Sequence, residues 1–218
     1  MVPVRLTGPR LAIREYHHTP EELDALHALF GDPEVTRYLP FEPRDREACA
    51  DQLALYLEGA MEEERETYRL AVTLHGADAE PQAEADAAPR ADARARADAG
   101  ADDPADAAPI GQAALTLGPY RSAELGYVLR RDAWGHGYGS ETARLLCVLA
   151  FDHLGLHRLA ASVDVDNAVS VRVLGKLGFQ REGRVRHDVL KGGVWSDSYL
   201  YSLLADEWRG SGTAGTGG

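Results

Sequence analysis

The chain has 218 residues and a formal net charge of −12 at pH 7. This length suits one domain with an ample core, and the acidic balance argues against a protein that binds nucleic acid irrespective of its sequence. The N-terminus lacks the long apolar run of a signal peptide, and the longest apolar helix stretch, Leu145 to Phe151, is too short to span a membrane, so we expect a cytoplasmic protein with no membrane partner.

The N-terminal part is predicted to form a broken strand followed by helices. Thr19-Pro20-Glu21-Glu22 has the spacing of a capping box with proline at the first helical position, which starts a helix that ends at Gly31. Both cysteines, Cys49 and Cys147, fall in predicted helices and are expected to be reduced thiols, with Cys147 facing the core. In chain order we expect extended chain over 4–14 with a turn at 7–9, helices over 20–31 and 45–64, and a helical turn over 33–38.

An insertion interrupts the strands that follow. Alternation over Tyr68 to Leu74 predicts a strand with Arg69 on one face and Leu70 on the other. Residues 76–109 carry nine acidic and three basic residues, fifteen alanines and four prolines. This composition offers almost no large side chain to bury, so we predict a disordered insertion at a hairpin tip, with an interaction segment as the alternative. Strands over 110–117 and 123–130 come next.

Residues Ala133 to Glu141 form the most informative stretch, with glycines at 135, 137 and 139 between a strand and an amphipathic helix over 142–154. Glycine permits positive φ and close approach of a ligand, and amides at a helix N-terminus converge on an anion. We therefore predict a phosphate or pyrophosphate site, and the alternative is a turn that only connects strand to helix. The spacing lacks the pattern of a dinucleotide fold or of a nucleoside-triphosphate loop.

The C-terminal third completes a mixed sheet. A strand over 157–165 is followed by a short helix that Asp166 or Asn167 caps at its start and Gly178 at its end. A last hairpin is expected over 184–190 and 194–203, with a turn at Gly192. The predicted fold is α+β, a mixed and largely antiparallel central sheet with helices on both faces. It forms a single domain over 1–209, followed by a flexible tail over 210–218.

At this point the chain resembles the GNAT acetyltransferase superfamily, in which Gln/Arg-x-x-Gly-x-Gly holds the pyrophosphate of acetyl-CoA. Trp134 takes the place of the usual Gln/Arg, a departure shared with the subgroup of ribosomal-protein N-terminal acetyltransferases. Four stretches are similar to that subgroup: Leu6 to Arg14, Glu124-x-Gly-Tyr127, Trp134-Gly-x-Gly-Tyr138, and Asn167-x-x-Ser-x-x-Val-Leu-x-Lys-Leu-Gly-Phe179.

The resemblance implies an acyl-CoA N-acyltransferase fold with acetyl-CoA as co-substrate and no metal. Its pyrophosphate is expected on the backbone amides of the loop. The pantetheine arm is expected to pair with a splayed strand edge, where an amide also polarises the thioester oxygen, although an ordinary central strand fits the same residues. Asn167 is expected to bond the pantetheine, to cap the helix, or both. The implied cofactor-binding residues are Tyr127, Val128, Leu129, Gly135, His136, Gly137, Tyr138, Gly139, Ser140 and Asn167.

Two residues are candidates for the proton transfers. The family's usual tyrosine, seven places after the asparagine, is Leu174 here and has no proton to give. Ser170, one turn into the same helix, is the candidate donor to the leaving thiolate, unless it only bonds back to its own helix. Glu124 resembles the subgroup's strand glutamate and is the candidate general base. Rival bases are His153, His157 and His187, and an acceptor pocket lined by Tyr38, Trp195, Asp197 and Tyr199 is possible.

We therefore predict an acetyl-CoA-dependent N-acetyltransferase whose acceptor is the N-terminal α-amine of a protein. One alternative acceptor is a small cationic amine such as an antibiotic, an amino acid or a polyamine. A non-catalytic acyl-CoA-binding sensor is the alternative from another class, which Leu174 leaves open. The sequence is compatible with a monomer or a homodimer.

Overall fold

The computed structural model describes residues 3–75 and 107–213, and these build one eight-stranded sheet in the order β1-β2-β3-β4-β5-β6-β8-β7. Neighbouring strands are antiparallel except β5 and β6, which run parallel. The insertion predicted over 76–109 lies outside the described residues, apart from its last three. The strands are β1 Arg5–Thr7, β2 Leu11–Glu15, β3 Thr67–Leu74, β4 Gly111–Gly118, β5 Ser122–Leu129, β6 Arg158–Asp164, β7 Gln180–Lys191 and β8 Val194–Leu204.

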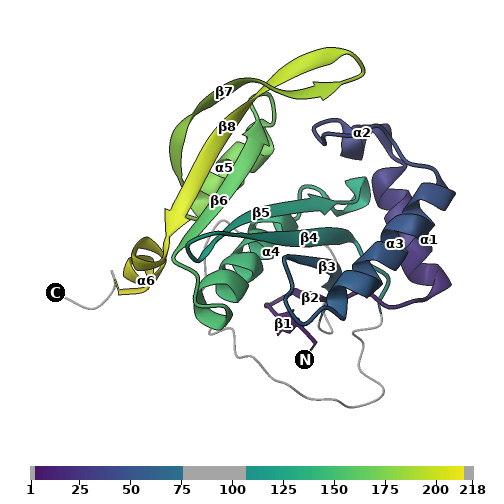
Figure 1. Cartoon of the computed structure of the whole chain (residues 1–218), viewed down its shortest axis with the longest axis horizontal. Helices are drawn as coiled ribbons and strands as arrows, with labels where there is room; N and C mark the ends of the chain where they lie inside the picture. Colours follow the sequence, from purple (N-terminus) through teal and green to yellow (C-terminus); the bar gives the residue numbers. More distant parts are fainter. Residues whose placement is uncertain (1–2, 76–106, 214–218) are drawn as a thin grey trace.

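Helices cover both faces of this sheet, which confirms the predicted α+β class (Figure 1). The first three pack on one face around a small core with Ala71 and Val128. The next two pack on the other face, in the larger core that contains Leu125 and Leu159. The helices are α1 Pro20–Phe30, α2 Pro33–Thr36, α3 Arg46–Ala60, α4 Tyr138–Cys147, α5 Ala168–Lys176 and α6 Ala205–Thr213.

Strands β5 and β6 separate partway along their length. They pair only from Ser122 to Glu124 on β5, opposite Arg158 to Ala160 on β6. Beyond Glu124, β5 continues to Leu129 along β4 alone, and the two strands diverge in Figure 1. The predicted splayed sheet edge is therefore present.

The predicted helices are present, and two of their boundaries differ. The Thr19 hydroxyl accepts the Glu22 N–H, but only this half of the capping box forms, because the Glu22 carboxylate pairs with buried Arg14 at 2.5 Å instead. Helix α3 ends at Ala60, short of the predicted end at residue 64, and Met61 just beyond it is 83 % exposed. Helix α4 begins earlier than predicted, at Tyr138, and continues as a π-helical turn over Val148–His153.

The C-terminal prediction is wrong in part, because helix α6 extends to Thr213, inside the range predicted as a flexible tail. The Glu207 carboxylate accepts the Leu204 N–H at 2.9 Å where this helix begins. The Trp208 ring stacks on Phe151 with centroids 6.0 Å apart, which ties the helix to the core. Residues 214–218 lie outside the described part.

Both cysteines are free and buried, and Cys147 faces the larger core as predicted. Within the two described stretches, no helix has the length and apolar character that crossing a membrane requires.

Candidate active site

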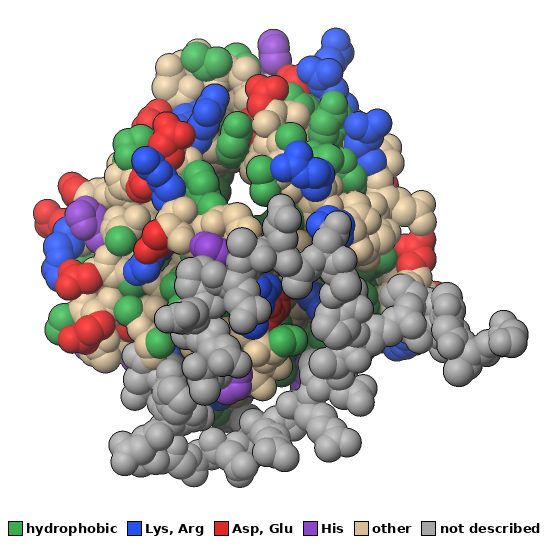
Figure 2. Space-filling model, turned by 180° about the vertical axis from the view of Figure 1, so that it is seen from behind, with side chains coloured by type: hydrophobic (Ala, Val, Ile, Leu, Met, Phe, Trp, Pro, Cys, Tyr) green, Lys and Arg blue, Asp and Glu red, His purple; other side chains and the backbone are tan. Residues whose placement is uncertain are grey.

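A cavity of about 900 Å³ occupies the space where β5 and β6 diverge. One wall is the start of α4 and the start of α5, and the opposite wall is the segment from α2 into α3. Figure 2 shows the molecule hollowed near its centre, with hydrophobic and basic side chains around the opening. The cavity thus extends from the N-terminus of α4, past the edge of β5, to polar side chains on the face of the sheet that α1 to α3 cover.

The glycine loop presents its backbone amides at the start of α4. Gly135 and Gly137 have φ of +83° and +75°, conformations that only glycine adopts without strain. Within the described residues, the five amides from Gly135 to Gly139 have no hydrogen-bond acceptor. A Cβ placed on Gly135 would meet no atom within 4 Å, so the space beside the loop is open. Ser140 is different, since its N–H donates to the Gly137 carbonyl at 3.1 Å.

An ion pair that sequence reasoning missed holds this loop in position. The Glu141 carboxylate accepts the N–H groups of Arg10 (2.8 Å) and Leu11 (3.0 Å), and the Arg10 Nε donates to it at 2.9 Å. The Arg10 guanidinium also donates to the His136 carbonyl at 2.9 Å and lies 4.9 Å from the Tyr138 ring centroid. His136, predicted in the cofactor site, does not line the cavity with its side chain.

The free edge of β5 consists of alternate residues. Val128 is the cross-strand partner of Gln112, and the Arg130 N–H donates to the Ile110 carbonyl, so residues 128 and 130 turn their backbone groups toward β4. In an antiparallel pair the residues between them face away, and Tyr127 and Leu129 therefore direct their N–H groups into the opening. The prediction for Val128 is corrected, because its backbone belongs to the β4 ladder. The Leu129 carbonyl is occupied by the Trp134 indole N–H at 2.8 Å.

The start of α5 brings the other predicted groups to the same opening. Asn167 is the N-cap, and its Oδ1 accepts the Ser170 N–H at 3.1 Å, which leaves its NH₂ group available. The Ser170 side chain lies beside the Tyr127 phenol on β5. Burial raises the pKa of that phenol, which keeps it protonated at neutral pH, while the neighbouring Ser170 hydroxyl opposes the rise. Sequence reasoning assigned only the backbone of Tyr127 and missed that its phenol lies beside Ser170.

The candidate bases lie away from the cavity. Glu124 is exposed and does not line it, so the expectation of a half-buried carboxylate beside the cleft is wrong. It lies on the same sheet face as Gly126, two residues further along β5, and Thr116 is its partner on β4. The rivals His153, His157 and His187 are exposed, and none of them lines the cavity.

Of the four side chains proposed for an acceptor pocket, only Tyr38 lines the cavity. Asp197 binds Arg184 and the His187 N–H on the β7–β8 hairpin instead, and Trp195 and Tyr199 also lie outside the lining. The hairpin reaches the other wall through Lys191, whose Nζ donates to the Thr36 carbonyl of α2 at 2.7 Å. This contact joins the last hairpin to the α2 side of the cavity.

Comparisons with known proteins show which family the chain resembles. The pattern of the family described as Acetyltransferase (GNAT) domain matches residues 10–180. Uncharacterized N-acetyltransferase YnaD of Bacillus subtilis (strain 168) is 36 % identical over 86 residues, which is 39 % of this chain and 51 % of YnaD, so the match spans about half of that relative. Uncharacterized N-acetyltransferase YoaA of the same strain is 28 % identical over 205 residues, covering 94 % of this chain and 98 % of YoaA.

Two solved structures share the fold at low sequence identity. Mycobacterium smegmatis RimJ in complex with CoA-disulfide superposes with a TM-score of 0.69 and 18 % identity, over 95 % of this chain and 91 % of that one. Spermidine N-acetyltransferase from Vibrio cholerae, in complex with CoA and spermine, superposes with a TM-score of 0.69 and 18 % identity, over 93 % of this chain and 99 % of that one. At this identity the likeness establishes the fold alone.

Proposed function

The chain belongs to the GNAT acetyltransferase family, and on that premise we propose that it transfers the acetyl group of acetyl-CoA to the N-terminal α-amine of a protein. The observation that carries the proposal is the free strand edge at Tyr127 and Leu129 beside the amides of Gly135 to Gly139, which have no acceptor among the residues that the structure describes. A helix N-terminus suits a pyrophosphate, and an unpaired edge suits an amide-bearing chain. The resemblance to the N-terminal acetyltransferase subgroup supports the acceptor.

The residues present fit acetyl-CoA. The loop amides would hold its pyrophosphate, and the space beside Gly135 is free of side chains. The N–H groups of Tyr127 and Leu129, together with the free NH₂ of Asn167, would bond the pantetheine arm. When bound, acetyl-CoA supplies an acetyl thioester beside β5. A Cβ on Gly126 would meet no atom within 4 Å, so the space next to this edge is open on the acceptor side.

Transfer requires one C–N bond to form and one C–S bond to break, while the amine loses a proton and the thiolate gains one. Ser170 is the donor to the thiolate in this proposal, and the protonated Tyr127 phenol orients its hydroxyl. Glu124, exposed on the acceptor face, acts on the acceptor ammonium through water. An α-amine has a pKa of about 7.7 to 8.0 and needs far less assistance than a lysine amine at about 10.4.

A thiol-release assay with acetyl-CoA tests this function. The acceptors are a set of peptides with free N-termini, the same peptides blocked at the N-terminus, and spermidine. We expect turnover of the free peptides, with the acetyl group found on the α-amine by mass spectrometry, and none of the blocked ones. Turnover of spermidine but of no peptide would replace the proposed acceptor with a small amine. Binding of acetyl-CoA without any turnover would point to a sensor.

A further inference from the structure

The acceptor side of the cavity is lined by two cationic side chains, two amides and a phenol, which we call the arginine pocket: Arg44, Arg69, Gln52, Gln112 and Tyr56. Arg69 on β3 shares a sheet face with Ala71, which packs in the core beneath α1 and α3. Gln112 is the cross-strand partner of Ala71. The pocket therefore belongs to the sheet face opposite α4.

Small residues lie between the arginine pocket and the free edge of β5. Arg69 lies opposite Ala114 on β4, and Ala114 lies opposite Gly126 on β5. Nothing stands within 4 Å of where a Cβ on Gly126 would be, so the floor of the cavity is open toward β5. Two strand spacings amount to about 10 Å, and an extended residue spans about 3.3–3.6 Å. An acceptor amine at Gly126 thus places its first or second side chain within reach of Arg69.

The two guanidinium groups of the pocket have no carboxylate partner among the described residues. The Arg69 guanidinium makes no hydrogen bond or ion pair within the described part of the chain. Arg44 donates to Gln52 and lies 4.3 Å from the Phe41 ring centroid, contacts that leave its charge uncompensated. Both cations act on Tyr56, where they oppose the burial that raises the pKa of its phenol. Both also line the cavity, in a chain whose net charge is −12.

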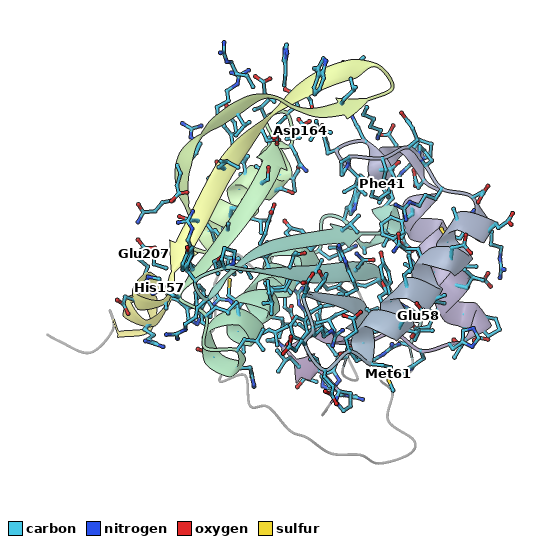
Figure 3. The ribbon with its side chains drawn as sticks, viewed as in Figure 1. Phe41, Glu58, Met61, His157, Asp164 and Glu207 are labelled. Carbon is cyan, nitrogen blue, oxygen red and sulfur yellow. The ribbon has the colours of Figure 1, made fainter. Side chains whose placement is uncertain are left out.

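The carboxylates that also line the cavity lie elsewhere. Glu34 is exposed on α2. Asp164 ends β6, and its Oδ1 accepts the Asp166 N–H at 2.8 Å. Figure 3 shows Asp164 across the cavity from Phe41, the ring on which Arg44 packs. The arginine pocket thus presents positive charge to an acceptor that enters the cavity between Asp164 and Phe41.

Gln112 adds a second, independent sign of a ligand. Its side chain is 6 % exposed and lines the cavity. The carboxamide lies beside the Tyr56 phenol and opposes the rise in the pKa of that phenol, and its Oε1 is buried with no partner in the described part of the chain. A buried acceptor without a donor is costly, and a peptide N–H would satisfy it. An acceptor that supplies both an N–H and a carboxylate is an acidic peptide.

We propose that the acceptor is an acidic protein N-terminus, with Asp or Glu as its first or second residue. The side-chain carboxylate binds Arg69 and Arg44, and a peptide N–H near the N-terminus donates to Gln112. This inference rests on the proposed function and narrows it to one class of N-terminus. Polyamines fit poorly, because their charges would face the two guanidinium groups.

The test uses three peptides that start with Ser and differ only in the second residue, Glu, Gln or Lys. We expect kcat/KM for the Glu peptide to exceed that for the Gln peptide at least 10-fold, mainly through KM, with the Lys peptide poorest. Arg69→Gln should abolish the preference for Glu and leave the Gln peptide within about 3-fold of its native rate, while Arg69→Lys should retain part of the preference.

The matched control is Arg46→Gln. It removes an exposed cation at the start of α3, which pairs with Asp24 of α1. It should keep the full preference, and thermal unfolding of each variant checks that the fold survives. Equal rates for the three peptides in the native enzyme, or an intact preference in folded Arg69→Gln, would overturn the inference while N-terminal acetylation stands. Free glutamate used better than the Glu peptide would also overturn it. Turnover of spermidine but of none of the peptides would instead overturn the proposed function.

Discussion

Replacing Gly137 by alanine is expected to damage acetyl-CoA binding far more than it damages the fold. Gly137 is the N-cap of α4 at φ +75°, and an added Cβ would lie 3.4 Å from the Arg10 guanidinium that holds the loop. Holding an L-residue in this region costs about 1–2 kcal/mol, so urea unfolding should show a loss of that size. Where the loop shifts to relieve this strain, the neighbouring loop amides turn away from the proposed pyrophosphate site. A hydrogen bond to a charged group contributes about 1.5–3 kcal/mol, so losing one weakens binding about 10- to 150-fold.

Gly178→Ala is the matched control for this strain. Gly178 has φ +87°, and a Cβ there would meet only Leu203 Cδ1, at 3.9 Å. It does not line the cavity. Isothermal calorimetry should therefore give native affinity for acetyl-CoA in Gly178→Ala, at a similar loss of stability. Native affinity in folded Gly137→Ala would refute the assignment of the loop, and an equal loss of affinity in both variants would show that the effect is global.

Three further expectations concern individual groups. Ser170→Ala should lower kcat about 10²- to 10⁴-fold with little change in acetyl-CoA affinity, and an unimpaired variant would leave the thiolate to be protonated by solvent. Glu124→Gln should lose most rate at low pH, where the acceptor amine is protonated, and recover as pH rises; a native pH profile would remove Glu124 from the mechanism. Burial raises the pKa of Cys147 to about 12 and also that of Cys49, so a thiol reagent at pH 8 should label both only after unfolding, and rapid labelling of the folded protein would contradict the burial.

Local patterns were enough to predict much of the backbone geometry at the glycine loop and at the start of α5. The glycines at 135 and 137 predict positive φ, because no other residue adopts it without strain, and both residues have positive φ in the structure. Asn167 caps α5 as its position predicts, since its short side chain reaches an amide three residues on. The antiparallel strands follow from alternation and turn residues. These features depend on neighbours in the chain, and neighbours in the chain are visible in a sequence.

The surroundings of Arg44, Arg69 and Glu124, on the proposed acceptor side of the cavity, could not be predicted in the same way. Arg69 was correctly placed on one face of its strand, but Arg44 lines the same cavity only because of how the segment that leads into α3 packs over the sheet. The exposure of Glu124 depends on where β5 and β6 separate, and half of the predicted capping box fails because Glu22 meets Arg14 from another strand. Each of these is a contact between distant segments.

The sequence by itself determined the class of fold, the family resemblance and the glycine loop, because backbone conformation and hydrophobic periodicity are local properties. Tertiary structure alone decided that Ser170 lies beside the Tyr127 phenol, and that Val128 turns its backbone to β4 while its neighbours face the cleft. It also decided that Arg44 and Arg69 line one cavity, with no ion-pair partner among the residues that the structure describes. The physical reason is that strand register and helix packing set which side chains meet. Burial then sets whether each group is protonated, paired or left free for a ligand.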